Sequence, residues 1–383
     1  MARHYLDHAS TSPPRPEVVA AMIGWFESSR HGTGDPGRVH TEGRIVRATV
    51  ETAREQVAAL LGTRPRQVVF TSGGTEAVNA ATWGATQARP GRPVVLAAVE
   101  HSSVRDASAR AGAVIHVGVD RLGRIDPAEV ESTLEEAARR GSPASLVHCQ
   151  VANHEVGTIQ PVAEVVEVCR RHDALVHVDA CTSAGHLETV LDELGADLMS
   201  VSAHKLGGPP GTGALLVRRG LRVPPLVVGG EQERARRGGF ENVAGIVGFG
   251  AVAEVLREPG RIGRESADAR RRTDAILDAA TSVEDVVVLG DPDRRAPHLV
   301  CVAVGGVEAE PVLLGLDQSG IAAHSGSSCS SESLAPSPVL EAMGTDAERS
   351  LRLSVGWSTT DRDVDAFAAA FPRVVSALRA LRA

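Results

Sequence analysis

One lysine stands between an apolar stretch and a glycine-rich loop. Lys205 follows the apolar run at 197 to 202, and the loop LGGPPGTG follows it at 206 to 213. A lysine at the end of a buried strand, beside a loop that lets a ligand approach the backbone, suits an amine that forms a Schiff base with a carbonyl compound. The alternative is a structural lysine that extends its charged end to the surface.

Two further groups complement such an amine. Asp179 ends the apolar run at 174 to 178, where a buried carboxylate requires a cationic partner, such as a protonated pyridine nitrogen. Residues 71 to 76 (TSGGTE) form a glycine turn that opens a helix and presents backbone N–H groups to an anion such as a phosphate. Glycine turns of this kind are also common without a ligand. Taken together, the three features indicate pyridoxal phosphate held as a Schiff base on Lys205.

Alternating apolar and helical segments must position these groups. Short runs rich in valine and leucine predict seven buried strands, at 68–70, 93–99, 113–119, 145–151, 174–180, 197–202 and 213–219. Helical stretches separate them; the one from Val46 to Leu61 has apolar residues three and four apart, and Gly62 follows as a stop. The pattern predicts an α/β fold with a mainly parallel, seven-stranded sheet covered by helices. Ligands in such folds bind at the carboxyl ends of the strands.

The alternation of apolar runs and helical stretches gives way to a different pattern after about residue 255. A charged helical stretch is followed by strands near 285–289, 299–304 and 351–355, and then by a terminal helix in which Pro372 predicts a kink or a break. We expect a large domain at residues 15–255 and a smaller α+β domain made of residues 1–14 and 256–383.

Composition narrows the function classes. The chain has 383 residues, 43% of them hydrophobic, and a net charge of -8, which is typical of a globular protein without a nucleic-acid or anionic-membrane partner. It has no apolar run that suits a signal peptide or a membrane span, so we expect a cytoplasmic protein. We expect no metal ion. Five cysteines are an odd number for a disulfide framework, and Cys149, Cys169, Cys181 and Cys301 are expected to be small core residues.

Eight motifs along the chain resemble those of the cysteine desulfurases. They are YLDHAST near the start, FTSGGTEAVN at 70–79, VEHSSV at 99–104, ANHEVGTIQP at 152–161, HVDA at 177–180, SAHKLGGPPGTGAL at 202–215, GGEQER at 229–234 and SGSSCSSESLAPSPVL at 325–340. They occur in the family's order and cover nearly the whole chain. The resemblance implies a fold-type I pyridoxal-phosphate enzyme of the class V aminotransferase group.

The resemblance also implies roles for single residues. For the cofactor, it implies that His101 stacks on the pyridine ring, that Asp179 pairs with the ring nitrogen and that Lys205 carries the cofactor. The phosphate would be held next to Gly74 by Thr75, Ser202 and His204. For the substrate, it implies that Arg352 binds the carboxylate and that Cys329 is the sulfur nucleophile. The alternatives are a polar loop residue for His101 and a structural ion pair for Arg352.

Cys329 separates this chemistry from related ones. It lies in a stretch of small polar residues, 325–331, without apolar periodicity, which predicts an exposed loop. Loops of this kind carry nucleophiles that must travel. An exposed cysteine without a function is the alternative.

Four residues depart from the family pattern and mark a divergent member. His154 replaces an asparagine near the cofactor and substrate, and Thr182 replaces a glutamine that contacts the ring's 3-oxygen. Phe240 replaces a threonine that reaches the neighbouring subunit's phosphate, and Asp35 replaces an asparagine near the substrate. A carboxylate at position 35 would repel the carboxylate of the substrate.

The resemblance implies a homodimer that converts L-cysteine to L-alanine and leaves a persulfide on Cys329. The sulfur would then pass to a protein acceptor, as in the supply of iron–sulfur or thio-cofactor synthesis. The departures leave open another reaction on the same scaffold, such as a carbon–sulfur or selenocysteine lyase or an aminotransferase. A non-catalytic sulfur-relay scaffold is the third alternative, and the joint presence of Lys205, Asp179 and Cys329 argues against it.

Overall fold

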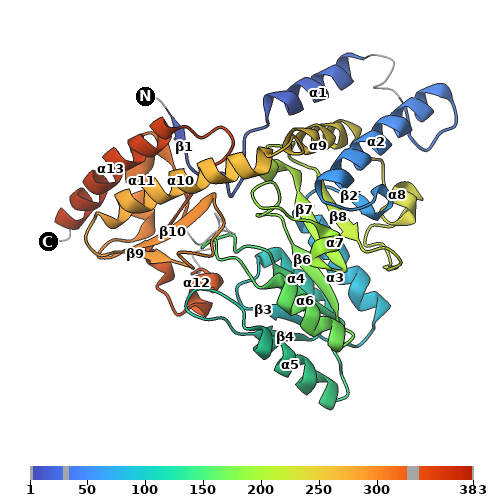
Figure 1. The fold of residues 1–383 in the computed structure, drawn as a ribbon, viewed down its shortest axis with the longest axis horizontal. Coiled ribbons are helices and arrows are strands. Elements are labelled where there is room, and N and C mark those ends of the chain that lie inside the picture. The colour runs from blue at the N-terminus through green and yellow to red at the C-terminus, as the bar shows by residue number, and fades with distance from the viewer. Residues whose placement is uncertain (1–2, 29–33, 326–335, 382–383) are drawn as a thin grey trace.

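A seven-stranded sheet forms the centre of the larger part of the chain (Figure 1). The computed structural model describes residues 3–28, 34–325 and 336–381. The strands are β2 (Val68–Thr71), β3 (Val94–Ala97), β4 (Val114–Val117), β5 (Leu146–Gln150), β6 (Leu175–Asp179), β7 (Leu198–Ser202) and β8 (Gly213–Val217). Their order is β2-β8-β7-β6-β5-β3-β4. All seven predicted strands are therefore confirmed.

The sheet is mainly parallel, as predicted. Only β8 runs antiparallel to its neighbours β2 and β7, and the remaining pairs are parallel. All strands except β8 consequently end at one edge, which is where Thr71, Asp179 and Ser202 leave the sheet.

Helices cover both faces of this sheet. They are α2 (Thr41–Leu60), α3 (Gly74–Ala88), α4 (Ser102–Ala111), α5 (Pro127–Arg139), α6 (Val162–Arg171), α7 (Leu191–Leu194), α8 (Gln232–Ala235) and α9 (Val243–Leu256), and α1 (Pro16–Glu27) packs on α9. Successive strand residues pack on opposite faces: Phe70 belongs to the same apolar cluster as α2, α6 and α9, whereas Val69 packs with α3 and α4. Because both faces are covered, the strands are apolar throughout.

A second, antiparallel sheet lies toward the chain ends, in the order β12-β10-β9 (Figure 1). Its strands are β9 (Val286–Leu289), β10 (Leu299–Val304) and β12 (Ser350–Ser354), and the helices beside it are α10 (Arg261–Thr281), α11 (Ala309–Gln318), α12 (Pro338–Ala342) and α13 (Asp361–Ala380). The short strand β1 (His4–Tyr5) pairs with β11 (Ile321–Ala322), so the first residues join this part. The predicted domain boundaries themselves stay a prediction.

The terminal helix does not break at Pro372. Helix α13 continues to Ala380, and the buried residues Phe367, Phe371 and Val375 lie on both sides of the proline. Packing of this apolar face compensates for the hydrogen bond that proline removes. None of the helices in the described ranges is long and apolar enough to cross a membrane.

Candidate active site

A cavity of about 270 Å³ opens where the strands of the large sheet end. It is lined by Ala9, Ser10, Gly74, Thr75, His101, Ser103, Gln150, Ala152, His154, Asp179, Cys181, Thr182, Ser202, His204, Lys205 and Arg352. We call it the lysine cavity. It brings together every predicted site residue of the described chain except Asp35.

Lys205 enters this cavity from the short 3₁₀ helix η2 (Ala203–Leu206), which follows β7 directly. Gly207 ends the helix with a left-handed φ of 82°, which favours glycine. Among the 40 lysine and arginine residues of the chain, Lys205 is the only lysine. A Schiff base to a side-chain amine can therefore form nowhere else in this protein.

Asp179 supplies negative charge to the same cavity. Its Oδ1 accepts hydrogen bonds from the backbone N–H of Cys181 at 2.9 Å and from the hydroxyl of Ser200 at 3.1 Å. Burial alone would raise its pKa, but His177, the N–H of Cys181 and His101 together hold the pKa below its usual value. An ionised carboxylate in this setting suits a cationic ligand group.

An anion cradle lies at the start of α3. Thr75 lines the cavity in the first turn of this 15-residue helix. The hydroxyl of Ser202 is buried and has no hydrogen-bond partner among the described residues. A Cβ at Gly74 would lie 2.5 Å from the Cys181 Sγ, so only glycine fits between the turn and the strand ends. A helix N-terminus beside an unsatisfied hydroxyl fits a phosphate.

His204 flanks the lysine and is held by the N-terminal segment. Its Nδ1 lies 3.0 Å from the Thr11 hydroxyl. Burial, and then the charge of Lys205, lower the pKa of His204 to about 4. The ring is therefore neutral at neutral pH and keeps one N–H to donate.

Two histidine rings meet at the wall of the cavity. His101 begins α4, and its Nδ1 accepts the backbone N–H of Ser103 at 3.1 Å. The proton of a neutral ring then sits on Nε2. The ring of His154 contacts His101 edge-on, with 4.8 Å between the ring centroids and an interplanar angle of 69°.

Arg352 reaches the cavity from β12, in the other sheet. Its Nη1 donates to the carbonyl of His154 at 2.9 Å, and its Nη2 donates to Asp7 at 3.0 Å and to Ser10 at 2.7 Å. The buried Nε has no partner among the described residues. Arg352 is thus a member of an ion pair, and it also lines the cavity.

Comparison with known proteins agrees with this arrangement. Residues 4–367 match the family described as Aminotransferase class-V. The cysteine desulfurase IscS 1 of Archaeoglobus fulgidus is 38% identical over 386 residues, which cover 98% of each chain. This chain is a member of the cysteine desulfurase family.

Solved structures of similar fold support the assignment. A NifS-like protein from Rickettsia africae superposes with a TM-score of 0.88 at 27% identity, covering 98% of this chain and 99% of the other. A structure described as SspA in complex with cysteine has a TM-score of 0.79 at 26% identity, covering 93% and 100% of the two chains. Cysteine desulfurases and class-V aminotransferases use pyridoxal phosphate, and the cofactor of this family member is pyridoxal phosphate.

The lysine cavity of this cysteine desulfurase family member fits that cofactor. The cradle at Gly74 and Ser202 suits the phosphate, Asp179 suits a protonated ring nitrogen, and Lys205 is the one amine available for the covalent link.

Asp35 lies away from the lysine cavity. It lines a different cavity of about 520 Å³ between α2 and α8, where its Oδ1 accepts the N–H of Gly37 at 2.7 Å and its Oδ2 lies 3.1 Å from Arg38. A single chain therefore does not bring Asp35 to the substrate, and its predicted role requires a second copy. Phe240 is 62% exposed and is likewise outside the lysine cavity. Cys329 lies outside the described residues.

Two residues near the cofactor site were missed by the sequence analysis. Gln150 ends β5 and lines the cavity, and the rule that identified Asp179, a polar residue at the end of an apolar strand, would have found it. The buried Glu100 stands behind it, with Oε1 accepting the Gln150 N–H at 2.9 Å. Burial, and then the charge of Asp179, raise the pKa of Glu100 to about 8, so this carboxyl group is protonated at neutral pH.

The four described cysteines are buried, as predicted. The thiol of Cys181 nevertheless lines the lysine cavity. Burial and the charge of Asp179 raise its pKa well above the usual value, so it remains a thiol rather than a thiolate.

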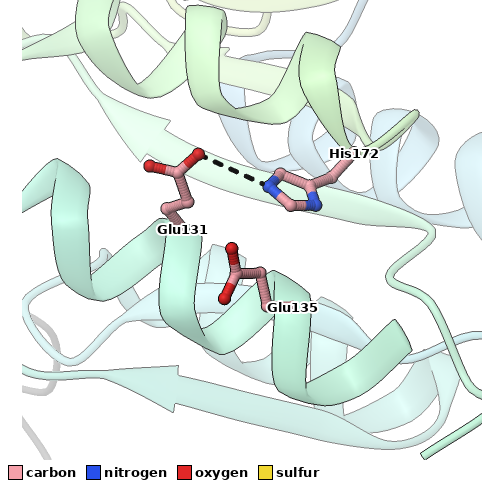
Figure 2. Close-up of side chains that lie close together, drawn as sticks. All are labelled: Glu131, Glu135 and His172. Atoms are coloured by element: carbon pink, nitrogen blue, oxygen red, sulfur yellow. Dashed lines mark ion pairs between the residues drawn. The ribbon is translucent and has the colours of Figure 1, made fainter. Parts of the chain in front are cut away.

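One cluster in the described part of the chain has the composition of a metal site. Glu131, Glu135 and His172 place their ligand atoms within 4.8 Å of one another (Figure 2). The carboxylate of Glu131 is already paired with Arg171 at 2.8 Å. The cluster lies on α5 and at the end of α6, outside the lysine cavity, so it contributes nothing to the chemistry there.

Proposed function

We propose that this protein is a pyridoxal-phosphate-dependent cysteine desulfurase, which converts L-cysteine to L-alanine and leaves the sulfur as a persulfide on Cys329. The proposal rests on one observation: the only lysine of the chain shares a cavity with an ionised Asp179 and with Arg352. A scaffold that only relays sulfur needs none of these groups at that position.

Different residues of the lysine cavity would bind different parts of the cofactor. Thr75, Ser202, His204 and the turn at Gly74 would hold the phosphate, Asp179 would hold the ring nitrogen, and His101 would contact the ring. When bound, pyridoxal phosphate supplies a carbonyl carbon for the substrate amine and an electron sink for the carbon next to it. Thr182 and His154 also line the cavity, so these two departures from the family pattern would lie beside the bound cofactor.

Arg352 would bind the substrate carboxylate. Its guanidinium faces the cavity with a buried Nε that has no described partner. A planar guanidinium suits a carboxylate. The similar structure described as a complex with cysteine supports L-cysteine as the substrate.

Lys205 would also move the proton. Its Nζ belongs to the only side-chain amine of the chain, and an amine released from a covalent link can take the proton from the α-carbon of the bound amino acid. The neighbouring His204 ring is neutral at neutral pH, so it does not add a second positive charge beside this amine.

Cys329 would attack the sulfur of the substrate as a thiolate. The new S–S bond forms as the C–S bond breaks, the carbon keeps the electron pair and gains a proton, and the products are alanine and a persulfide. The balance requires no external oxidant or reductant. The described residues on either side of the segment that contains Cys329 contact the site, which supports this role. Before it, His324 pairs with the backbone of Arg352, and after it, Ser337 donates a hydrogen bond to Glu155 next to His154.

The product pattern distinguishes this reaction from its alternatives. With L-cysteine and a reducing agent, a desulfurase releases alanine and sulfide in equal amounts. A carbon–sulfur lyase also releases sulfide but forms pyruvate and ammonia in place of alanine, and an aminotransferase consumes a keto acid. We expect the wild type to form alanine and sulfide in equal amounts and Lys205→Ala to form neither. Pyruvate in place of alanine would establish the lyase.

We also propose a homodimer, a protein sulfur acceptor and a cytoplasmic location, where thiols stay reduced. Helix α1 supports the dimer, because Val19, Ile23 and Phe26 recur at helical spacing and are 43%, 49% and 67% exposed. Light scattering should give about twice the chain mass of 40.0 kDa, and Phe26→Asp should shift the protein toward the single-chain mass. A wild-type mass of one chain would refute the dimer.

A further inference from the structure

A third cavity, of about 300 Å³, is lined by five arginines and, among the described residues, by no acidic one. We call it the arginine cavity, and its arginines are Arg64, Arg66, Arg218, Arg219 and Arg236. The chain as a whole carries a net charge of -8, so this concentration of positive charge is a local reversal. Like charges that line one cavity repel one another, and an anion bound between them offsets the repulsion.

The arginine cavity lies at the edge of the sheet opposite the lysine cavity. Its residues come from the 3₁₀ helix η1 (Pro65–Gln67), which precedes β2, and from the turn at 218–221, which follows β8. Val68 is paired with Leu216, so the start of β2 and the end of β8 lie side by side. The lysine cavity is built where β2 ends and where β8 begins. A ligand in the arginine cavity is therefore separate from the cofactor.

Little of this charge is compensated within the described chain. Arg218 pairs with Asp197 at 2.6 Å, and the other four arginines form no ion pair with any residue that the structure describes. Arg139 and Arg140, at the end of α5, are by comparison both paired with Glu136.

Arg236 is the innermost of the five and is half-buried. It donates from Nε to the carbonyl of Glu233 and from Nη2 to the carbonyl of Val68, at 3.2 and 3.0 Å. The nearby Glu233 carboxylate is already held by Arg54, at 2.6 and 2.7 Å. Burial lowers the pKa of Arg236 to about 10. A half-buried guanidinium without a carboxylate partner is costly unless an anion satisfies it.

We propose that the arginine cavity binds the phosphate chain of a small molecule that carries two or more linked phosphates. Guanidinium groups bind phosphate oxygens in pairs through planar, charge-assisted hydrogen bonds. Four uncompensated arginines call for a multivalent anion, and the volume is that of a site for a small molecule. This site goes beyond the proposed desulfurase reaction, since it contains none of the residues of the lysine cavity.

Calorimetric titration of the cofactor-loaded protein with inorganic triphosphate tests the proposal. Saturating pyridoxal phosphate keeps the probe out of the cofactor's own phosphate site. We expect one site per chain, with binding that weakens as salt increases. The double variant R66Q/R219Q should lower the affinity by about tenfold or more, because each lost contact is a charge-assisted hydrogen bond.

The double variant R139Q/R140Q is the matched control, since it removes the same charge from an exposed position on α5. Its affinity for triphosphate should equal that of the wild type, and the cofactor absorption of both variants should be unchanged. Equal affinities in R66Q/R219Q and wild type would overturn the proposal, as would the absence of saturable binding. A poly-glutamate peptide that competes with triphosphate at equal charge would also overturn it, in favour of an acidic protein segment.

Discussion

The guanidinium of Arg352 lies 3.0 Å from the carboxylate of Asp7, a residue 345 positions away in the sequence. The pair joins β12 to the segment that follows β1, at the wall of the lysine cavity. Asp7 compensates a guanidinium that would otherwise be buried without a counter-charge. A substrate carboxylate that binds to Arg352, as we propose, would share its guanidinium with Asp7.

Arg352→Gln should raise the KM for L-cysteine by about ten- to a hundredfold, since a hydrogen bond to a charged group is worth roughly 1.5–3 kcal/mol. The visible absorption of the bound cofactor should persist, because no residue of the phosphate cradle is changed. Steady-state kinetics and absorption spectra measure the two effects.

Asp7→Asn is the control for the ion pair, since it keeps a hydrogen-bond acceptor near Arg352 but removes the charge. It should alter KM less than Arg352→Gln does. An unchanged KM in Arg352→Gln, together with a lower unfolding temperature, would mean that Arg352 has only a structural role.

Lys205→Ala should abolish turnover and the covalent attachment of the cofactor. The variant contains no lysine at all, so borohydride reduction followed by mass spectrometry should find no cofactor adduct on any side chain. Its circular dichroism should match the wild type, because the lysine is not part of the apolar core. A reduced adduct elsewhere in the chain would contradict the assignment.

Cys329→Ala should still bind the cofactor and still show a spectral change with L-cysteine, because that change depends on Lys205 and Asp179. Alanine and persulfide formation should fall to a small fraction of the wild-type rate. The matched control is Cys181→Ala, which removes a thiol that lines the cavity but whose raised pKa keeps it protonated.

Cys181→Ala should therefore retain sulfur transfer. If it loses persulfide formation while Cys329→Ala keeps it, Cys181 is the nucleophile and the cofactor chemistry stands. Wild-type sulfide release by Cys329→Ala, without any persulfide on the protein, would favour the lyase.

Acid should destabilise the fold between about pH 6.5 and 4. Burial lowers the pKa of His8 and of His177 to about 4 from the ordinary 6.5. Between these values the unfolded chain binds protons that the folded chain does not, so the free energy of unfolding falls as pH falls. Each histidine contributes about 1.4 kcal/mol per pH unit.

Urea unfolding at pH 7, 6 and 5 measures this dependence. His177→Gln should reduce the slope, and His116→Gln, at an exposed position on β4, should leave it unchanged. An unfolding midpoint that does not move between pH 7 and pH 5 would exclude the effect.

The sequence alone determined the seven strands and most of the site. Strands covered on both faces are apolar throughout, so the sequence shows where each strand ends. A parallel sheet brings those ends together. That is why strand ends alone pointed to Asp179 and Lys205, which do share one cavity, whereas Ser202 in the same cavity was predicted from the family resemblance. The same reasoning would have included Gln150.

Only the tertiary structure decided what depends on contacts between distant segments. The partner of Arg352 is Asp7, far away in the sequence, so no local pattern could separate an ion pair from a ligand site. The protonated state of Glu100 follows from its complete burial beside Asp179. Asp35 lies in the cavity between α2 and α8 because the packing of α2 against α9 positions the loop before α2. Strand ends follow from local sequence, whereas burial and charge pairing follow from the packing of segments that the sequence keeps apart.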